Sequence, residues 1–205
     1  MTKILTEKEA EDFLEKENFP IVKRKIAKNK KEILSYAKEI GFPVVLKNPS
    51  LLHKTEKNAI KTNITEKNIE NALKELEKTK PSTILIQKQI QGSEILIGLK
   101  KDPSFGHVIA FGLGGIYSEI LKDVSFRICP ITKKDAAAMI KEIKGYQLLK
   151  GARGKKPVNI KLIENILIKI SNLAKKYPNI KELDINPFMV NEKHAKIVDA
   201  RIIFD

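Results

Sequence analysis

GFPVVLKNPSLLHK, residues 41 to 54, combines an apolar strand-like run, a lysine at its end and a histidine on the turn that follows. The run predicts a buried strand, and Lys47 at its end would present a fixed positive charge to a phosphate. His53 lies six residues further on, and an imidazole with its ordinary pKa of about 6.5 is largely neutral and nucleophilic near pH 7. Phosphorylation of His53 is therefore our first hypothesis. The alternative is a surface turn with an ordinary histidine.

The composition is ordinary for a soluble protein of one domain or two closely joined lobes, with 205 residues, 42% hydrophobic and 31% charged. No apolar run approaches the roughly 20 residues that cross a bilayer, and the amino terminus is charged and amphipathic. The single cysteine, Cys129, excludes an internal disulfide and a cysteine-based zinc cage. We therefore expect a cytoplasmic protein without a membrane partner.

The net charge of +14 comes from 39 basic residues, of which 35 are lysine, spread along the chain. Proteins that bind nucleic acid usually concentrate charge in one stripe, with arginine or aromatic residues among it. Aromatic residues make up 6% here and tryptophan is missing. We expect a solvated lysine coat that attracts anionic substrates, and no nucleic-acid partner. Tight binding to duplex or single-stranded nucleic acid that weakens steeply with added salt would support the opposite view.

Local signals predict the elements of the first half. Capping boxes at Thr6–Glu9 and Asn29–Glu32 predict helices that end near Asn18 and at Gly41. Thr65 is expected to cap a third helix, which ends near Lys78. The predicted strands are Ile21–Ile26, Pro43–Lys47, Ala59–Ile64 and Ser82–Gln87.

The second half has more strands and fewer helices. Helices are expected from the Thr132 cap to about Lys144 and from about Val158 to Lys176. The predicted strands are Ile95–Leu99, His107–Phe111, Val124–Ile128, Glu182–Asn186 and Ile197–Arg201. The fold class that follows is α+β, in two lobes that join near Gln87–Gln91.

Several polar residues lie where one nucleotide could touch them all. The strand-like backbone of Gln87, Lys88, Gln89 and Ile90 can offer N–H and C=O groups to an adenine edge, and Glu94 can accept from ribose hydroxyls. Asn186 and Asp199, expected on adjacent strand ends, supply the hard oxygen ligands that Mg²⁺ prefers. Each residue taken alone is more often an ordinary strand residue, so the order and spacing carry the prediction.

Other candidates keep two interpretations each. Gly114 and Gly115 can form an anion-binding nest or simply a tight turn. Arg127 and Arg201 can neutralise phosphate or pair with a nearby carboxylate. His107 and His194 are expected to be non-catalytic, and Cys129 to be a small core residue.

The segments that carry a family resemblance include SEILIGLKKDPSFG from Ser93, FGLGGIYSEILKDVSFR from Phe111, ELDINP from Glu182 and VDARI from Val198. On these, the chain resembles the beta subunit of the archaeal-type ADP-forming acetyl-CoA (acyl-CoA) synthetases. These are ATP-grasp proteins related to the succinyl-CoA synthetase beta subunit. The resemblance implies an ATP-grasp fold, with the nucleotide between two α+β lobes of a single module, 1–205. It places the smaller lobe at 20–86 and the larger at 1–19 with 87–205.

The resemblance also implies an activity. Family members interconvert acyl-CoA, ADP and phosphate with a carboxylic acid, CoA and ATP, using ATP or ADP and Mg²⁺. Their partner is a CoA-binding alpha subunit, in an assembly of two alpha and two beta chains. His53 would take the phosphoryl group and deliver it to ADP. Lys47, Glu94, Asn186 and Asp199 match the positions that hold the nucleotide and its magnesium.

Two departures from the family pattern support an alternative. Asn58-Ala59 stands where the family commonly has a Gly-Gly pair, and alanine is strained in a left-handed conformation. Lys88 stands at a position that is often acidic. Both changes motivate a second hypothesis, a catalytically degenerate nucleotide-sensing or scaffold subunit. The carboxylic acid used by such an enzyme is not encoded in this chain, because the family's alpha subunit recognises it.

Overall fold

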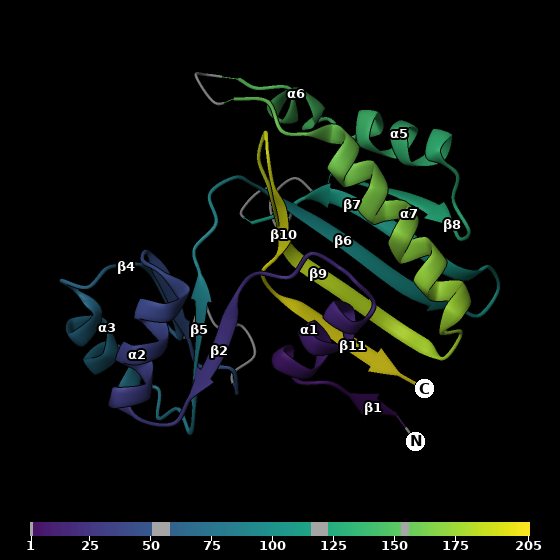
Figure 1. Cartoon of the computed structure of the whole chain (residues 1–205). Helices are drawn as coiled ribbons and strands as arrows, with labels where there is room; N and C mark the ends of the chain where they lie inside the picture. Colours follow the sequence, from purple (N-terminus) through teal and green to yellow (C-terminus); the bar gives the residue numbers. More distant parts are fainter. Residues whose placement is uncertain (1, 51–57, 116–122, 153–155) are drawn as a thin grey trace. The chain divides into compact units, whose positions relative to one another are not determined.

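A computed structural model describes residues 2–50, 58–115, 123–152 and 156–205 (Figure 1). The chain divides into two compact units. Unit 1 comprises Met1–Ile21 and Gln91–Asp205, and unit 2 comprises Val22–Ile90. Each unit has its own sheet, helices and buried apolar cluster, so the α+β class is confirmed.

Unit 1 is built on an antiparallel sheet. Within the described residues seven strands form it, in the order β1-β11-β9-β6-β7-β8, with β10 paired to β9. The strands are β1 Lys3–Ile4, β6 Ser93–Asp102, β7 Gly106–Leu113, β8 Val124–Ile128, β9 Ile180–Val190, β10 Ala195–Ile197 and β11 Ala200–Phe204. The helices are α1 Glu7–Lys16, α5 Lys133–Glu142, α6 Tyr146–Leu149 and α7 Ile160–Lys176.

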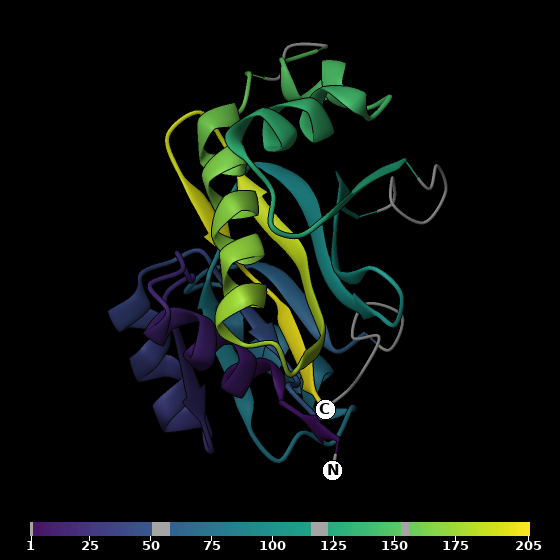
Figure 2. The same cartoon turned by 90° about the vertical axis from the view of Figure 1, so that its right-hand side faces the viewer.

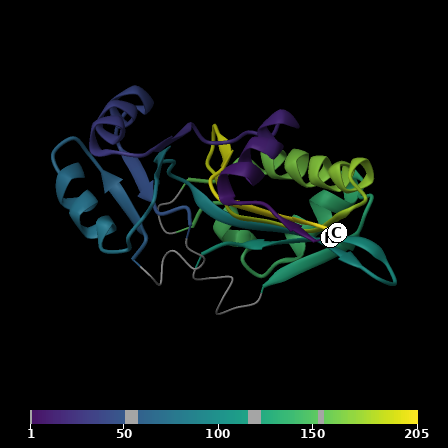
Figure 3. The ribbon, with the colours of Figure 1, turned by 90° about the horizontal axis from the view of Figure 1, so that it is seen from below.

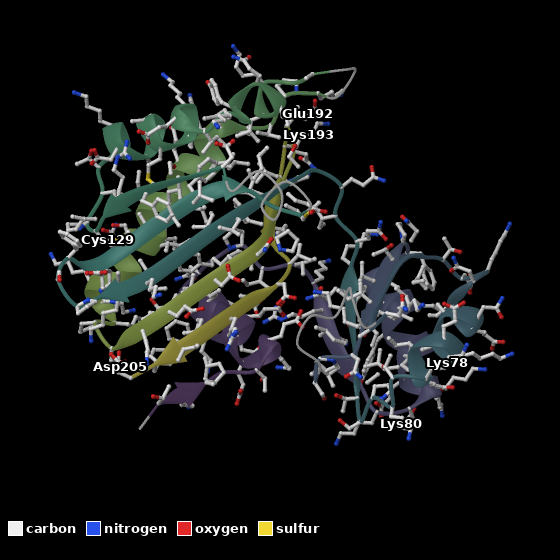
Figure 4. The ribbon with its side chains drawn as sticks, turned by 180° about the vertical axis from the view of Figure 1, so that it is seen from behind. Lys78, Lys80, Cys129, Glu192, Lys193 and Asp205 are labelled. Atoms are coloured by element: carbon white, nitrogen blue, oxygen red, sulfur yellow. The ribbon has the colours of Figure 1, made fainter. Side chains whose placement is uncertain are left out.

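One face of this sheet carries the helices. The long helix α7 lies over this face of the sheet (Figure 2), and α1 lies on the same side of β9 and β11 (Figure 3). Strand alternation sends Ile95, Ile97 and Leu99 of β6 into this core, where they are fully buried. Gly98 and Lys100 therefore belong to the opposite face, which Figure 4 shows in front of the helices.

Unit 2 has a four-stranded antiparallel sheet in the order β2-β5-β3-β4. Its elements are β2 Arg24–Ala27, α2 Lys30–Ile40, β3 Val44–Lys47, β4 Ile60–Ile64, α3 Ile69–Glu77 and β5 Ile84–Lys88. Val44, Leu46 and Ile86 belong to the apolar cluster that α2 and α3 cover. By alternation, Lys47 and Gln87 belong to the other face of the sheet.

The predicted capping box at Thr6 is present, and the predicted cap at Thr132 forms one as well. Asn29 caps α2 by accepting from the Glu32 amide, but the Glu32 carboxylate accepts from the Lys28 amide, so the reciprocal bond of a capping box is not formed there. The predicted cap at Thr65 is wrong. Helix α3 begins at Ile69 after Asn68, and the Asn68 Oδ1 accepts a 2.7 Å hydrogen bond from the Thr65 amide. The asparagine side chain therefore closes a turn that delays the helix. Among the described helices, none has both the length and the apolar character needed to cross a bilayer.

The prediction of one strand over Ile197–Arg201 is also wrong. Strand β10 ends at Ile197, which pairs with Phe188, whereas β11 begins at Ala200, which pairs with Ile185. Both strands keep one register on β9, and Val198 and Asp199 form a local break opposite Pro187, which has no N–H to donate to the ladder. Strand β9 is longer than predicted and continues through a cis peptide bond before Pro187.

Candidate functional site

Lys47 ends β3 on the face of the unit 2 sheet that points away from α2 and α3. Its side chain is 3% exposed, and Gln87 is fully buried. Lys47 pairs with Leu85 and Val45 pairs with Gln87, so Lys47 and Gln87 are diagonal neighbours across β3 and β5. The structure thus brings two of the predicted nucleotide residues together.

The Lys88 side chain forms hydrogen bonds with the backbone between α2 and β3. Its Nζ donates hydrogen bonds of 2.8 Å to the carbonyl oxygens of both Gly41 and Phe42. Gly41 is the C-cap of α2, so the ammonium lies where the helix dipole favours positive charge. The lysine that departs from the family pattern therefore has a structural role, and its side chain is engaged there.

The Gln89 side chain is engaged in a similar way. Its Oε1 accepts from the Asn63 amide at 2.6 Å, and its Nε2 donates to the Asn63 Oδ1 at 2.7 Å. This pair ties the end of β4 to the residues that follow β5. A contact of Lys88, Gln89 or half-buried Ile90 with adenine therefore stays a prediction about their backbone.

His53 lies outside the described residues, which resume at Asn58. Asn58 has φ 54°, so it takes the left-handed conformation expected of a residue in the place of a glycine. Ala59 is buried with an ordinary φ, and its carbonyl accepts a 2.9 Å hydrogen bond from the Asn48 amide. The Asn58-Ala59 departure is therefore accommodated without the strain on alanine that the sequence suggested.

In unit 1, Glu94 lies directly against the two glycines that follow β7. The Gly114 amide donates to the Glu94 carbonyl oxygen at 2.8 Å. A methyl group added at Gly115, whose φ is 63°, would lie 2.2 Å from the Glu94 Oε2. A methyl group at Gly114 would lie 3.2 Å from the Asn186 Oδ1. The two glycines therefore leave room for the Glu94 and Asn186 side chains. The negative charge of the Glu94 carboxylate would repel an anion that bound to this turn without a metal ion.

Asn186 lies within β9, and Asp199 lies in the break between β10 and β11. The Asn186 amide donates to the Asp199 carbonyl oxygen at 3.2 Å. The two predicted magnesium ligands are therefore adjacent in the backbone, although neither is at the strand end where it was expected.

Asp184 was not singled out from the sequence, although it is part of ELDINP. Burial, together with the charges of Asp199 and Glu182, raises the pKa of its carboxyl group to about 6, against the opposing effect of Arg201. Arg201 is the cross-strand partner of Asp184. This region of the sheet thus carries more negative charge than Arg201 balances, and a role for Arg201 at a phosphate stays a prediction.

The residues present fit Mg²⁺ bound together with a nucleotide. Among the described residues there is no group of three or more histidine, cysteine or acidic side chains that could enclose a metal. An amide oxygen and a carboxylate on adjacent backbone positions, beside further acidic charge, suit an ion that takes its remaining ligands from water and phosphates.

The remaining candidates have structural partners. Arg127 forms an ion pair with Glu142 at 2.9 Å. A ring nitrogen of His107 lies 2.7 Å from the Ile180 carbonyl oxygen. Cys129 packs against the core, and burial raises the pKa of its thiol.

Comparison with known proteins places these features in a family. Residues 1–204 match the family described as the ATP-grasp domain. The chain is 44% identical to acetate–CoA ligase (ADP-forming) I subunit beta of Pyrococcus furiosus, covering 97% of this chain and 91% of the relative. It is 41% identical to acetate–CoA ligase (ADP-forming) I of Archaeoglobus fulgidus, where the match covers 87% of this chain but 28% of the longer relative.

A solved structure is similar over nearly the whole chain. It is the dinucleotide-forming acetyl-coenzyme A synthetase 1 of Candidatus Korarchaeum cryptofilum, with coenzyme A and Mg-AMPPCP, its phosphohistidine segment pointing towards the nucleotide binding site. The TM-score is 0.85 at 39% identity, with 99% of this chain and 93% of that chain covered.

Proposed function

The chain belongs to the ATP-grasp family, and from this premise we propose that it is the nucleotide-binding subunit of an ADP-forming acyl-CoA synthetase. The reaction converts acyl-CoA, ADP and phosphate to a carboxylic acid, CoA and ATP. Support comes from the similarity to beta subunits of ADP-forming acetate–CoA ligase along almost the full chain. The single observation that carries the site assignment is the grouping of Glu94 and Asn186 on Gly114 and Gly115, with Asp199 adjacent.

Each residue has a proposed task. Lys47 neutralises phosphate charge from the end of β3, and Glu94 accepts hydrogen bonds from ribose hydroxyls. Asn186 and Asp199 hold Mg²⁺, which when bound shields the phosphate charges and orients them for in-line transfer. The backbone of Gln87–Ile90 contacts the adenine.

His53 is the proposed phosphoryl carrier. A neutral ring nitrogen of His53 attacks the phosphorus carried by a histidine of the alpha subunit, a new P–N bond forms, and the P–N bond to the donor histidine breaks. In the second half of the cycle, a terminal oxygen of ADP attacks the phosphorus and the P–N bond breaks, so ATP leaves and the imidazole is neutral again. The relay divides one long transfer into two short ones.

The partner in this proposal is a CoA-binding alpha subunit, in an assembly of two alpha and two beta chains in the cytoplasm. The term beta subunit in the relatives' names supports a partner, and longer single-chain relatives contain this module as 28–30% of their length. The degenerate-subunit alternative loses its motivation, because Asn58 takes the left-handed conformation and Lys88 has its own structural role.

Reconstitution tests this function. The chain is combined with the CoA-binding subunit of the same source organism, and ATP formation is followed from acetyl-CoA, ADP and phosphate in the presence of Mg²⁺. We expect ATP to form when both subunits are present, and the Asp199→Asn variant to form much less. Acetyl-CoA, propionyl-CoA and longer acyl-CoA substrates are compared. Failure of every one of them to support ATP synthesis would refute the proposal.

A further inference from the structure

The face of the unit 1 sheet that carries Asp184 has an open hollow of about 360 Å³. It is lined by Gly98 and Ala110, which are cross-strand partners on β6 and β7, and by Phe126 of β8, the partner of Ala110. Val108 adds a further apolar wall. Asp184, Gly98, Ala110 and Phe126 form one cross-strand row on four neighbouring strands. Because Gly98 has no side chain, the hollow along this row can receive an apolar group.

The hollow continues into an exposed apolar strip on β8. Phe126 is 60% exposed and Ile128 is 54% exposed, and they lie two residues apart, on the same face of the strand. β8 is the last strand in the order of the described sheet. Large apolar side chains at such an edge invite association unless another surface covers them.

Polar groups surround this apolar centre. Lys100, Asp102 and Glu182 line the hollow, and Lys100 is the cross-strand partner of both Val108 and Glu182. An apolar centre with a polar, charged rim is the arrangement found in stable interfaces between different proteins. We call the set Gly98, Val108, Ala110, Phe126 and Ile128 the β8 face.

We propose that the β8 face is the docking surface for the CoA-binding subunit. This inference rests on the proposed function. Its first support is continuity with the site: Asp184 lines the hollow, is paired with Gly98, and precedes Asn186 by two residues on β9. A partner seated there would deliver its phosphoryl group beside the residues assigned to the nucleotide and Mg²⁺.

The second support is the amount of protein that this module accompanies in its relatives. In the single-chain relatives the module is 28–30% of the length, so it must adjoin a much larger remainder. A second copy of this chain would cover the same apolar groups but would bring no CoA site to the reaction. The CoA-binding subunit is therefore the occupant that the chemistry requires.

Threonine substitutions test the surface, because threonine suits a strand and removes the apolar contact. The double variant Phe126→Thr/Ile128→Thr is compared with Ile4→Thr, the matched control. Ile4 is also 60% exposed and lies on β1, at the opposite end of the same sheet. Each form of the full chain is titrated with the CoA-binding subunit of the same source by calorimetry. Light scattering measures the mass of each form alone, to detect self-association. ADP binding and thermal unfolding show whether each variant is folded.

We expect the double variant to bind the subunit at least tenfold more weakly than wild type, with ADP binding unchanged and Ile4→Thr unaffected. Wild-type affinity in the double variant would overturn the inference and leave the proposed function standing. Self-association of the wild type that the double variant abolishes would also overturn it, in favour of a second copy. If the wild type binds ADP but not the subunit, the inference fails and the nucleotide-binding role is kept. If the wild type does not bind ADP, the proposed function itself fails.

Discussion

The amide of Asn186 donates a hydrogen bond to the carbonyl oxygen of Asp199, at 3.2 Å, although the two residues are 13 positions apart. The bond joins the middle of β9 to the break between β10 and β11. The single register that β10 and β11 share on β9 sets Asp199 opposite Asn186, because Ile197 pairs with Phe188 and Ala200 with Ile185. The register of β9 with β10 and β11 therefore brings together the pair of ligands assigned to Mg²⁺.

The first prediction concerns this pair. Asp199→Asn removes the formal charge of one proposed ligand, so the apparent Kd for ADP in Mg²⁺ buffer should rise by at least about tenfold. The control is Asp205→Asn, which removes a surface carboxylate paired with Lys101. Titration calorimetry with and without EDTA makes the measurement. An equal loss of affinity in EDTA would contradict a role through the metal.

The second prediction concerns Gly115. A methyl group there would lie 2.2 Å from the Glu94 Oε2, on a residue with φ 63°. Gly115→Ala should therefore displace the Glu94 carboxylate and weaken ADP binding by about tenfold or more, besides costing about 1–2 kcal/mol of backbone strain.

Gly106 offers a matched control for this variant. Its φ is 72°, yet a methyl group there would meet nothing within 4 Å. Gly106→Ala should lose a similar free energy of unfolding, about 1–2 kcal/mol, and bind ADP as the wild type does. If both variants bind ADP equally well, Glu94 has no part in the nucleotide site.

The third prediction concerns Lys88. Lys88→Met removes two charge-assisted hydrogen bonds to the carbonyl oxygens of Gly41 and Phe42, so the free energy of unfolding should fall by about 1.5–3 kcal/mol. Lys25→Met removes an ion pair with Glu39 that lies at the surface, and should cost below about 1 kcal/mol. Urea unfolding measures the free energy of unfolding of both variants and of the wild type. Equal stability would mean that the Lys88 hydrogen bonds do not hold the turn.

The fourth prediction is a pH dependence at Asp184. Its pKa is raised in the folded chain, to about 6, mainly by burial, from an ordinary value of 3.8. The unfolded chain therefore releases this proton first, and the folded state loses stability as pH rises from about 4 to 6. Relative to wild type, Asp184→Asn should gain about 1–2 kcal/mol between pH 4 and pH 7.5 in metal-free buffer, allowing for partial solvent screening. A difference that does not vary with pH would contradict this electrostatic explanation.

Local signals in the sequence predicted much of the fold. Thr6 and Thr132 satisfy their own capping boxes, so neighbouring residues alone determine where those helices begin. Thr65 does not cap the helix, because the Asn68 Oδ1 accepts from the Thr65 amide in a turn and α3 begins only after Asn68. The break at Val198 and Asp199 was not predicted, because it depends on the neighbouring strand, where Pro187 has no N–H to donate to Val198.

The candidate site was also predicted only in part, where local sequence alone determines the structure. Lys47 at the end of a strand could be identified from an apolar run followed by a cation. The contact of Glu94 with Gly115 depends on the pairing of β6 and β7, which no local pattern contains. Asp184 carried a signal in ELDINP, but its raised pKa arises mainly from burial in the folded sheet, with a contribution from the charges of Asp199 and Glu182.

The most direct measurement is the position of the phosphoryl group on the chain itself. Incubated with Mg²⁺ and ATP labelled at the γ-phosphate, the isolated chain should take up label that is lost in acid and stable in base, as a phosphohistidine is. The His53→Asn variant should remain unlabelled while it still binds ADP, and the His107→Asn and His194→Asn variants should label as the wild type does. Label that persists in His53→Asn would contradict the account.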